Sequence, residues 1–275
     1  MDRKALATLI YQKLEPLVVD LRAQYARSKE EIGYFVVDDL FPEQVARDIY
    51  SAFPSPLSMK LNKSLREYKY IAAQMDRYDR KIEEAIYAFQ EPAVVDVIAR
   101  ICDMKDLRPD AHLYAGGISL MGKGNYLNPH IDNSHDKDRK LWRVLNLLYY
   151  VTPGWEEEYG GNLELWPKGA RKDQVTIFSK FNRLVVMTTH KDSWHSVSPV
   201  QSNGYRCCVS NYYFSSNPVR ATDTFHITSF RGRPEQRLRD SVLRADAAFR
   251  MLIRKMFKGG VVDTGHIYKK TDLAE

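Results

Sequence analysis

The sequence predicts a mixed fold with a mainly β core, a β-sandwich or barrel with helices packed outside it. From about residue 110, short runs rich in β-branched and aromatic residues follow one another, separated by Gly, Pro and Asn. Before this region, and again after residue 234, apolar residues recur at helical spacing. The chain has 275 residues, 44% of them hydrophobic and 28% charged, which is an ordinary globular composition with enough length for a sizeable core.

The N-terminal part is expected to consist of helices with one strand between them. Residues 3–29 carry Leu and Ile at spacings of three or four and predict a helix. Residues 33–38 predict a strand, and a further helix is expected to start around Pro42, because Pro suits the first turn. Residues 56–78 are polar and irregular, and residues 80–103 are expected to be helical.

The barrel core is expected to contain a series of short strands. These predicted strands are residues 118–121, 144–151, 163–166, 175–177, 184–188, 196–200 and 206–214. We expect a single domain, with a helical and strand-containing support over residues 1–109, the barrel core over 110–215, and a C-terminal extension over 216–275 that contains one long helix.

The last predicted helix, residues 234–257, carries a narrow apolar stripe. Its members follow one another at alternating spacings of four and three: Leu238, Val242, Ala245, Phe249, Leu252 and Met256. Two interpretations stay open. The stripe packs the helix on its own domain, or it forms the seam of a homodimer, as in a short coiled coil. Gly259-Gly260 is expected to end this helix.

Charge and cysteine content narrow the partners and the compartment. The net charge is +6, but the basic residues are dispersed among acids, which indicates a solvated surface rather than a nucleic-acid site. Three cysteines are too few for a disulfide scaffold, and adjacent Cys207 and Cys208 are a poor pair for one bridge, so a reducing cytoplasm is expected. No apolar run approaches the ~18 residues of a membrane span, and the N-terminus lacks the features of a signal peptide.

The clearest chemical signal is a His-x-Asp pair with a distant histidine. On a strand, positions two apart point to the same face, so His130 and Asp132 can converge on one point. His195 lies at the start of a later strand, which a barrel can bring alongside. Two imidazoles and one carboxylate on one face of a cation form the facial triad of non-haem Fe(II) oxygenases. Zinc is the alternative occupant of such a set.

Other residues bear on this site. His135 and His190 are rival ligands, but His135 lies in a polar loop expected at the surface and His190 in a turn-like run. Arg206 opens a strand eleven residues after His195. An arginine binds a carboxylate through two parallel hydrogen bonds, so Arg206 is a candidate for an anionic co-substrate, with a surface ion pair as the alternative.

Several longer segments carry a family resemblance. They are residues 128–133, 143–150, 155, 160–165, 181–186, 195–200 and 206. With these segments in this order, residues 110–215 resemble the catalytic core of the prolyl 4-hydroxylase type of Fe(II)/2-oxoglutarate-dependent dioxygenases. The resemblance implies a double-stranded β-helix, a jelly-roll or cupin-like barrel, and an oxidoreductase activity.

The resemblance also assigns roles. It implies Fe(II) held by His130, Asp132 and His195, and 2-oxoglutarate chelated to the iron with its far carboxylate on Arg206 and Tyr150 as a helper. O2 is the other co-substrate, and ascorbate an optional reductant. The implied reaction is hydroxylation of an unactivated C–H bond with release of succinate and CO2. Asp132 favours hydroxylation, because related halogenases lack this carboxylate.

Strand alternation refines the expected interior. Two sets are expected to face inward: Asn146, Leu148 and Tyr150, and Arg206, Cys208, Ser210 and Tyr212. One departure from the family pattern is Leu120, at the position of an inward tyrosine that often lies about ten residues before the first ligand.

The substrate is expected to be a small molecule, such as an amino acid, a sugar or a natural-product or glycan pathway intermediate. Hydroxylation of prolyl or other residues in a protein or peptide is the alternative, and a non-catalytic ligand-binding barrel is the second. Candidate substrate contacts are Asn128, Asn133, Asn146 and Trp194. Demethylases of nucleic acids in this superfamily resemble one another in a second arginine six residues after the co-substrate arginine. That position is Tyr212 here, so no nucleic-acid substrate is expected.

Overall fold

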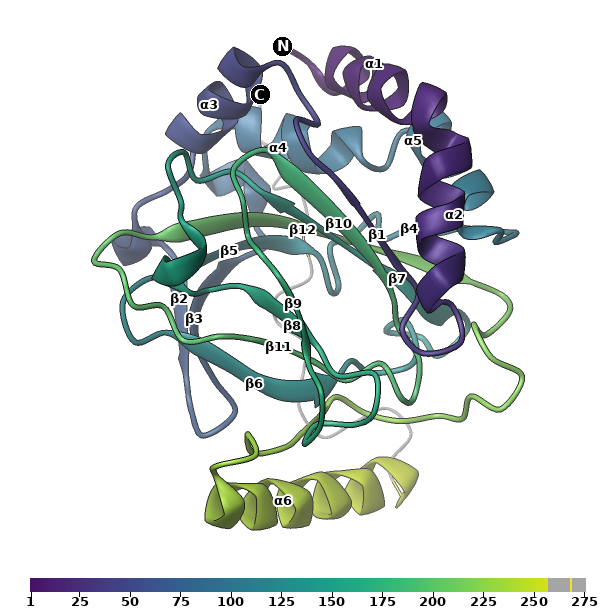
Figure 1. Cartoon of the computed structure of the whole chain (residues 1–275), viewed down its shortest axis with the longest axis vertical. Helices are drawn as coiled ribbons and strands as arrows, with labels where there is room; N and C mark the ends of the chain where they lie inside the picture. Colours follow the sequence, from purple (N-terminus) through teal and green to yellow (C-terminus); the bar gives the residue numbers. More distant parts are fainter. Residues whose placement is uncertain (257–267, 269–275) are drawn as a thin grey trace, which may run out of the picture.

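The computed structural model describes residues 1–256 and 268, and its centre is one curled antiparallel sheet (Figure 1). Along the sheet the order is β1 (Tyr34–Val37), β10 (Arg183–Thr188), β7 (Trp142–Tyr150), β12 (Arg206–Ser215), β5 (Gly117–Met121), β3 (Glu67–Ala72), β6 (Tyr126–Ile131), β11 (His195–Val197), β8 (Leu163–Leu165) and β9 (Val175–Ile177). Three short strands pair at the side: β2 (Lys60–Lys63) with β3, β4 (Arg108–Pro109) with β12, and β13 (Ser229–Phe230) with β6. The sheet is a double-stranded β-helix, as the resemblance implies.

The helices lie at two ends of the molecule. The N-terminal group is α1 (Arg3–Leu14), α2 (Val18–Ser28), α3 (Glu43–Ser51), α4 (Arg80–Ala88) and α5 (Pro92–Cys102), and α6 (Arg237–Met256) lies at the opposite end (Figure 1). Short 3-10 turns are η1 (Glu15–Leu17), η2 (Pro56–Ser58), η3 (Met75–Arg77) and η4 (Glu157–Tyr159). Within the described part of the chain, no helix is both long and apolar enough to span a bilayer.

Two of the predicted helices are each divided in the structure. The helix expected over residues 3–29 is interrupted by a 3-10 turn at Pro16, because Pro has no amide hydrogen for the helical ladder. The helical stretch expected over residues 80–103 is two helices. Pro92 begins the second, and Asp103 ends it in the left-handed region, with φ of 54°.

Strand alternation separates the core from the interior of the barrel. On β7, the odd-numbered Leu145, Leu147 and Tyr149 are buried in the same apolar cluster as the N-terminal helices. On β12, Cys207, Val209 and Tyr213 lie in that cluster too. Burying each large apolar side chain contributes about 1.5–3 kcal/mol, so this layer fixes which face of the sheet turns inward. The three cysteines are all free and buried.

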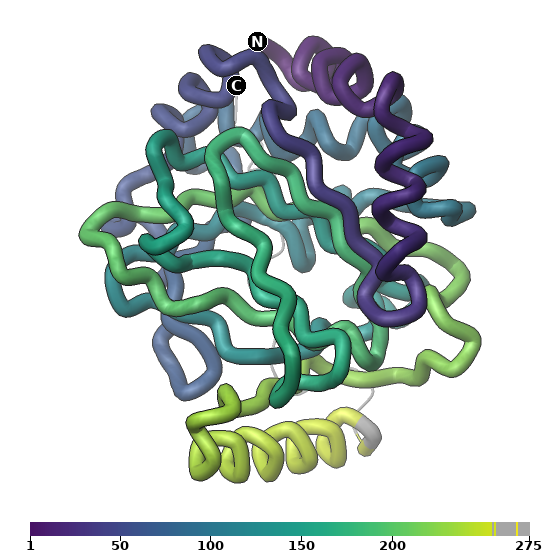
Figure 2. The backbone as a smooth tube through the Cα atoms, viewed as in Figure 1, coloured from purple at the N-terminus to yellow at the C-terminus, as the bar shows by residue number. Residues whose placement is uncertain are grey.

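The segment over residues 56–78 is not irregular, and the expectation from the sequence was wrong there. It contains the β2–β3 hairpin, whose strand β3 pairs with β5 through Tyr70 and with β6 through Glu67. All six residues of β3 are half-buried, so no alternation of buried and exposed positions marks it in the sequence. The hairpin reaches toward α6 (Figure 2), where Arg66 forms an ion pair with Asp246.

The apolar stripe of the last helix does not pack on its own domain, so that interpretation is wrong. Leu238 is 87% exposed and Phe249 is 63% exposed, and the other stripe residues are exposed as well. The helix packs through its opposite face, where Leu243 is buried and Asp240 accepts hydrogen bonds from Gly232 and Arg231. The expected stop at residues 259–260 lies outside the described residues.

Candidate active site

The two halves of the curled sheet enclose a cavity of about 680 Å³. Its lining includes all seven residues that strand alternation assigns to the interior: Asn146, Leu148, Tyr150, Arg206, Cys208, Ser210 and Tyr212. The predicted inward faces of these two strands are therefore confirmed. They bring chemically active side chains from β7 and β12 opposite those of β6 and β11.

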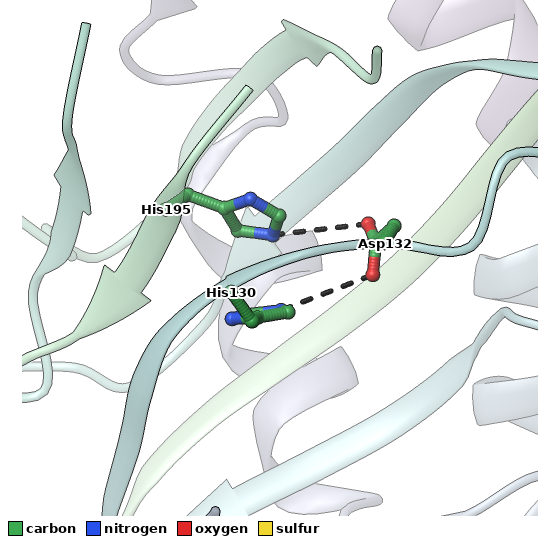
Figure 3. A group of neighbouring side chains, drawn as sticks. All are labelled: His130, Asp132 and His195. Atoms are coloured by element: carbon green, nitrogen blue, oxygen red, sulfur yellow. Dashed lines mark ion pairs between the residues drawn. The ribbon is translucent and has the colours of Figure 1, made fainter. Parts of the chain in front are cut away.

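His130, Asp132 and His195 all line this cavity, and their side chains point toward one another (Figure 3). His130 on β6 is the direct partner of His195 on β11 across the antiparallel pair. The Nε2 atoms of His130 and His195 lie 3.8 and 3.7 Å from the two carboxylate oxygens of Asp132. One ligand atom from each residue lies within 4.8 Å of the other two, so the three side chains can reach a single ion.

A β-bulge in β6 explains why His130 turns inward while Asn128 does not. The pairing with β11 runs from His195↔His130 to Val197↔Leu127, so β6 holds one extra residue there. Pro129 lies in this bulge, where its missing amide hydrogen costs no ladder bond. The side chain of Asn128 therefore turns to the β2–β3 hairpin and donates to the carbonyl of Leu65, 2.9 Å away.

Backbone carbonyls orient both imidazoles. Nδ1 of His130 lies 3.0 Å from the carbonyl oxygen of Asn128, and Nδ1 of His195 lies 2.9 Å from that of Ser193. A carbonyl oxygen only accepts hydrogen bonds, so each Nδ1 carries the proton and donates it. Each Nε2 is thereby left with its lone pair, directed at the common point. This is the arrangement by which proteins prepare histidines for metal binding.

The protonation states of His130 and Asp132 suit a cation. Burial lowers the pKa of His130 to about 3, with the neighbouring His195 acting in the same direction. Burial alone would raise the pKa of Asp132, but His195 and Arg143 hold it below its usual value. Neutral imidazole and ionised carboxylate are the forms that bind metal ions.

The donor set fits Fe(II). The Asp132 Oδ2 atom is buried and has no hydrogen-bond partner in the described structure, although an unpaired buried carboxylate oxygen is costly. Two nitrogens and one oxygen on one side of a point leave further positions open for other ligands, as non-haem Fe(II) sites require. The same three side chains could also hold zinc.

Arg206 is a buried guanidinium without a carboxylate partner among the described residues. Only 3% of its surface is exposed, and its Nε atom is unpaired. Its guanidinium carbon lies 5.3 Å from the ring centre of Tyr150, and Nη2 lies 2.7 Å from the sulfur of Met121. Charged groups are rarely buried without a partner, so this site fits the carboxylate of a ligand.

The remaining predicted residues divide into two groups. Asn133 and Asn146 line the cavity, and the Oδ1 atom of Asn146 is buried without a partner. Asn128 and Trp194 are not among the cavity-lining residues. Of the rival histidines, His190 lies outside this cavity beside the carbonyl of Glu31, 3.0 Å away.

Two expectations about individual positions were wrong. His135 was expected at the surface but lines the cavity, with its ring 4.1 Å from that of Trp142. Leu120 belongs to the helix-side cluster, so it does not take the inward position, and the neighbouring Met121 reaches Arg206 instead. The family resemblance placed the inward residue of β5 by its distance in sequence from His130. Such a distance does not show which face of the strand a residue lies on.

Sequence reasoning missed two basic residues beside the triad. Nη1 of Arg143 lies 3.6 Å from Asp132 Oδ1, and Arg143 is buried against Tyr212. Lys69 of β3 lines the cavity, and its charge helps to lower the pKa values of His130 and Asp132. Arg143 begins the segment 143–150, which carries part of the family resemblance, but no role was predicted for it. Lys69 lay in the segment read as irregular, where no pattern pointed inward.

Comparison with known proteins agrees with this geometry. Residues 116–214 match the family model of the 2OG-Fe(II) oxygenase superfamily. Similar solved structures include a prolyl-4-hydroxylase from Pseudomonas putida, with 15% identity, TM-score 0.53, and coverage of 70% of this chain and 97% of that one. The non-heme alpha ketoglutarate dependent carbocyclase SnoK from nogalamycin biosynthesis has 14% identity, TM-score 0.52, and coverage of 78% and 88%. At these identities the likeness shows the shared fold.

Proposed function

From the match of residues 116–214 to the family model of the 2OG-Fe(II) oxygenase superfamily, we propose that the chain hydroxylates an unactivated C–H bond of a small molecule. When bound, Fe(II) and 2-oxoglutarate supply the oxidation: O2 converts C–H to C–OH, and 2-oxoglutarate leaves as succinate and CO2. The observation that carries the proposal is the joint presence, in one cavity, of the His130–Asp132–His195 set and of Arg206, which has no carboxylate partner among the described residues.

One set of residues binds the metal, and another binds the co-substrate. His130, Asp132 and His195 hold the metal on one side, and the positions that they leave open are the places for the co-substrate and O2. Arg206 binds the far carboxylate of 2-oxoglutarate through charge-assisted hydrogen bonds. Tyr150, whose buried ring faces the guanidinium, holds Arg206 in place and limits its contact with water.

The barrel itself excludes water from the reacting atoms. Apolar side chains, among them Leu148, Leu163 and Val197, line the cavity beside the polar set. A reactive oxidant needs such shielding, because water or protein groups would otherwise consume it. Low dielectric surroundings also strengthen the contacts of Arg143 and Arg206 with anionic groups.

The dimensions of the cavity support a small substrate. Its volume of about 680 Å³ lies within the ~300–1,000 Å³ typical of sites for drug-sized ligands. The β2–β3 hairpin and α6 contribute Lys60, Lys69, Arg250 and Arg254 to its lining. These side chains favour a compact polar molecule.

The test is a substrate panel read by succinate release. Purified chain with Fe(II), 2-oxoglutarate and O2 is supplied with amino acids, sugars, natural-product intermediates and proline-containing peptides. We expect a small molecule to couple succinate release to formation of a hydroxylated product. Coupling by the peptides alone would replace the small-molecule proposal with peptide hydroxylation. Asp132→Ala is the control for background oxidation.

A further inference from the structure

The cavity contains more basic side chains than the negative charges of 2-oxoglutarate would balance. Eight basic side chains line it, against only two acidic ones, Asp132 and Asp136, within the described residues. Arg143 and Arg206 are two of the eight, and the others are Lys60, Lys69, Arg77, Arg139, Arg250 and Arg254. Basic residues elsewhere in the chain are dispersed among acids, so this concentration is specific to the cavity.

The expected cofactors do not neutralise this charge. The positive charges of Fe(II) and Arg206 are matched by Asp132 and the two carboxylates of 2-oxoglutarate. The second acid, Asp136, is occupied in its own loop, where Oδ1 accepts hydrogen bonds from the backbone of Lys140 and Leu141 at 2.7 and 3.2 Å. Of the other basic side chains, Lys69 pairs with Glu67 and Arg250 with Asp246, each at 3.0 Å. The rest leave the cavity with an excess of positive charge, which attracts an anion.

Unpaired polar atoms gather in the same place. The buried atoms without a hydrogen-bond partner in the described structure include Arg139 Nη2, Arg143 Nε and Arg250 Nη2, and all three residues line the cavity. Leaving a buried donor unpaired is unfavourable, so a group of such donors indicates that a ligand completes them. Only 6% of the surface of Arg143 is exposed, and its guanidinium is directed at Asp132.

Arg139 and two arginines of α6, Arg250 and Arg254, form a half-buried part of this basic set. Arg139 is held in the left-handed region with φ of 56°, a strained conformation for a non-glycine residue, and its guanidinium lies 4.4 Å from the ring centre of Phe225. Arg139 and Arg254 both line the cavity, and burial together with the like charge of Arg254 lowers the pKa of Arg139. Among the described residues, Arg250 shares its one ion-pair partner, Asp246, with Arg66.

We propose that Arg139, Arg250 and Arg254 form an anion subsite on the α6 side of the cavity, and that the substrate is a small molecule whose carboxylate or phosphate group binds there. The C–H bond to be oxidised then lies at the His130–Asp132–His195 set, with Arg143 between the two. This inference rests on the proposed function for the identity of the reaction. The binding of an anion at the subsite does not depend on that reaction.

The direct test is a titration of the full chain with inorganic phosphate at constant ionic strength, read by calorimetry and by thermal stability. We expect phosphate to bind wild type and to bind the Arg139→Gln/Arg254→Gln variant at least tenfold more weakly. The matched control is Arg22→Gln/Arg27→Gln, which removes the same charge from exposed positions on α2 and should bind phosphate as wild type does. Arg206→Gln shows whether phosphate occupies the co-substrate position instead.

Several results would overturn the subsite. The first is that wild type does not bind phosphate, and the second is that the α2 control weakens phosphate binding as much as the double variant does. The third is that Arg206→Gln abolishes phosphate binding while the Arg139→Gln/Arg254→Gln variant still binds phosphate as wild type does. Binding of Mn(II) and 2-oxoglutarate is measured on the same samples. If these fail to bind while phosphate binds normally, the proposed function fails and the anion subsite stands.

The substrate part is tested with matched pairs in the succinate assay, such as sugar phosphates against free sugars and acids against their amides. We expect the anionic member of a pair to drive turnover, and the double variant to raise its KM at least tenfold. A neutral member that drives turnover better than its anionic counterpart would overturn the substrate class.

Discussion

His130 and His195 lie directly opposite each other on the antiparallel strands β6 and β11, with their ring centres 4.1 Å apart. Because main-chain carbonyls orient both rings, the imidazoles are in place before any ion binds. Asp132 completes the set from the end of β6, two residues beyond His130. The register of a single strand pair thus brings together residues that lie far apart in the sequence.

The first prediction concerns the metal ligands. His130→Ala or Asp132→Ala should weaken Mn(II) binding by more than about 100-fold, because each removes one of three ligands, and even partners of ligands are worth ~10–100-fold. Electron paramagnetic resonance of free Mn(II) gives the affinity without any need for turnover. His112→Ala, at an exposed histidine, is the control. Either variant that binds Mn(II) within a few-fold of wild type would remove that residue from the site.

The second prediction concerns Arg206. Arg206→Ala should raise the KM for 2-oxoglutarate, because the variant loses a buried ion pair with the far carboxylate. A loss of about 2–4 kcal/mol corresponds to roughly 30- to 700-fold. Equilibrium binding of 2-oxoglutarate to the Mn(II)-loaded variant should weaken by a similar factor, while Mn(II) affinity stays as in wild type. An unchanged KM would show that the arginine is only structural.

The family resemblance implied the candidate metal and co-substrate residues, and the two-residue period of strands predicted which of them share a face. His130 and Asp132 share a face by that rule, and so do Arg206, Cys208 and Ser210. The rule fails at the bulge in β6, which turns Asn128 away from the face of His130. A bulge depends on pairing with β11, and one strand's sequence does not specify its partner.

Tertiary contacts explain the other failures. Lys69 was missed because β3 is half-buried on both sides and carries no alternation. Of the two interpretations of the α6 stripe, packing on its own domain was wrong, because the face containing Asp240 forms the contact instead. The spacing of hydrophobic residues correctly identifies an amphipathic helix. It does not show which face of the helix contacts the rest of the protein when ion pairs hold the helix in place.

The third prediction concerns the docking of α6. Asp240 is almost fully buried and accepts hydrogen bonds from Arg231, Arg171 and the backbone of Gly232. Asp240→Asn should destabilise the fold by about 1–3 kcal/mol at neutral pH, because these donors lose a charged acceptor. Hydrogen exchange of the α6 amides should speed up more than that of β7. Asp20→Asn, at an exposed position on α2, should change neither.

The pH dependence of this effect has a definite sign. Hydrogen bonds from Arg231 and Arg171 hold the pKa of Asp240 below its usual value. The stability that it contributes is therefore present at neutral pH and is lost as pH falls below about 3.9, the unfolded-state value, toward the lower folded pKa. The difference between wild type and Asp240→Asn in urea unfolding should shrink in that acidic range. A difference that grows as pH falls would contradict this role.

The fourth prediction concerns the exposed stripe of α6. Its spacing of four and three is that of a coiled-coil seam, and an antiparallel second copy would place the small Ala245 opposite the large Phe249. We expect a homodimer in solution at micromolar concentration, which light scattering after size exclusion would detect. Phe249→Asp should give monomers with unchanged Mn(II) binding. A monomeric wild type would end this prediction.

The central claim is that this cavity binds Fe(II) and 2-oxoglutarate together, and an anaerobic titration tests it most directly. Metal-free protein is titrated with Fe(II), with 2-oxoglutarate, and with both, while the visible spectrum is recorded. The account predicts a weak charge-transfer band that needs both additions, because it arises only when the co-substrate chelates protein-bound iron. The band should vanish in Asp132→Ala. No band with a folded wild-type protein would contradict the account.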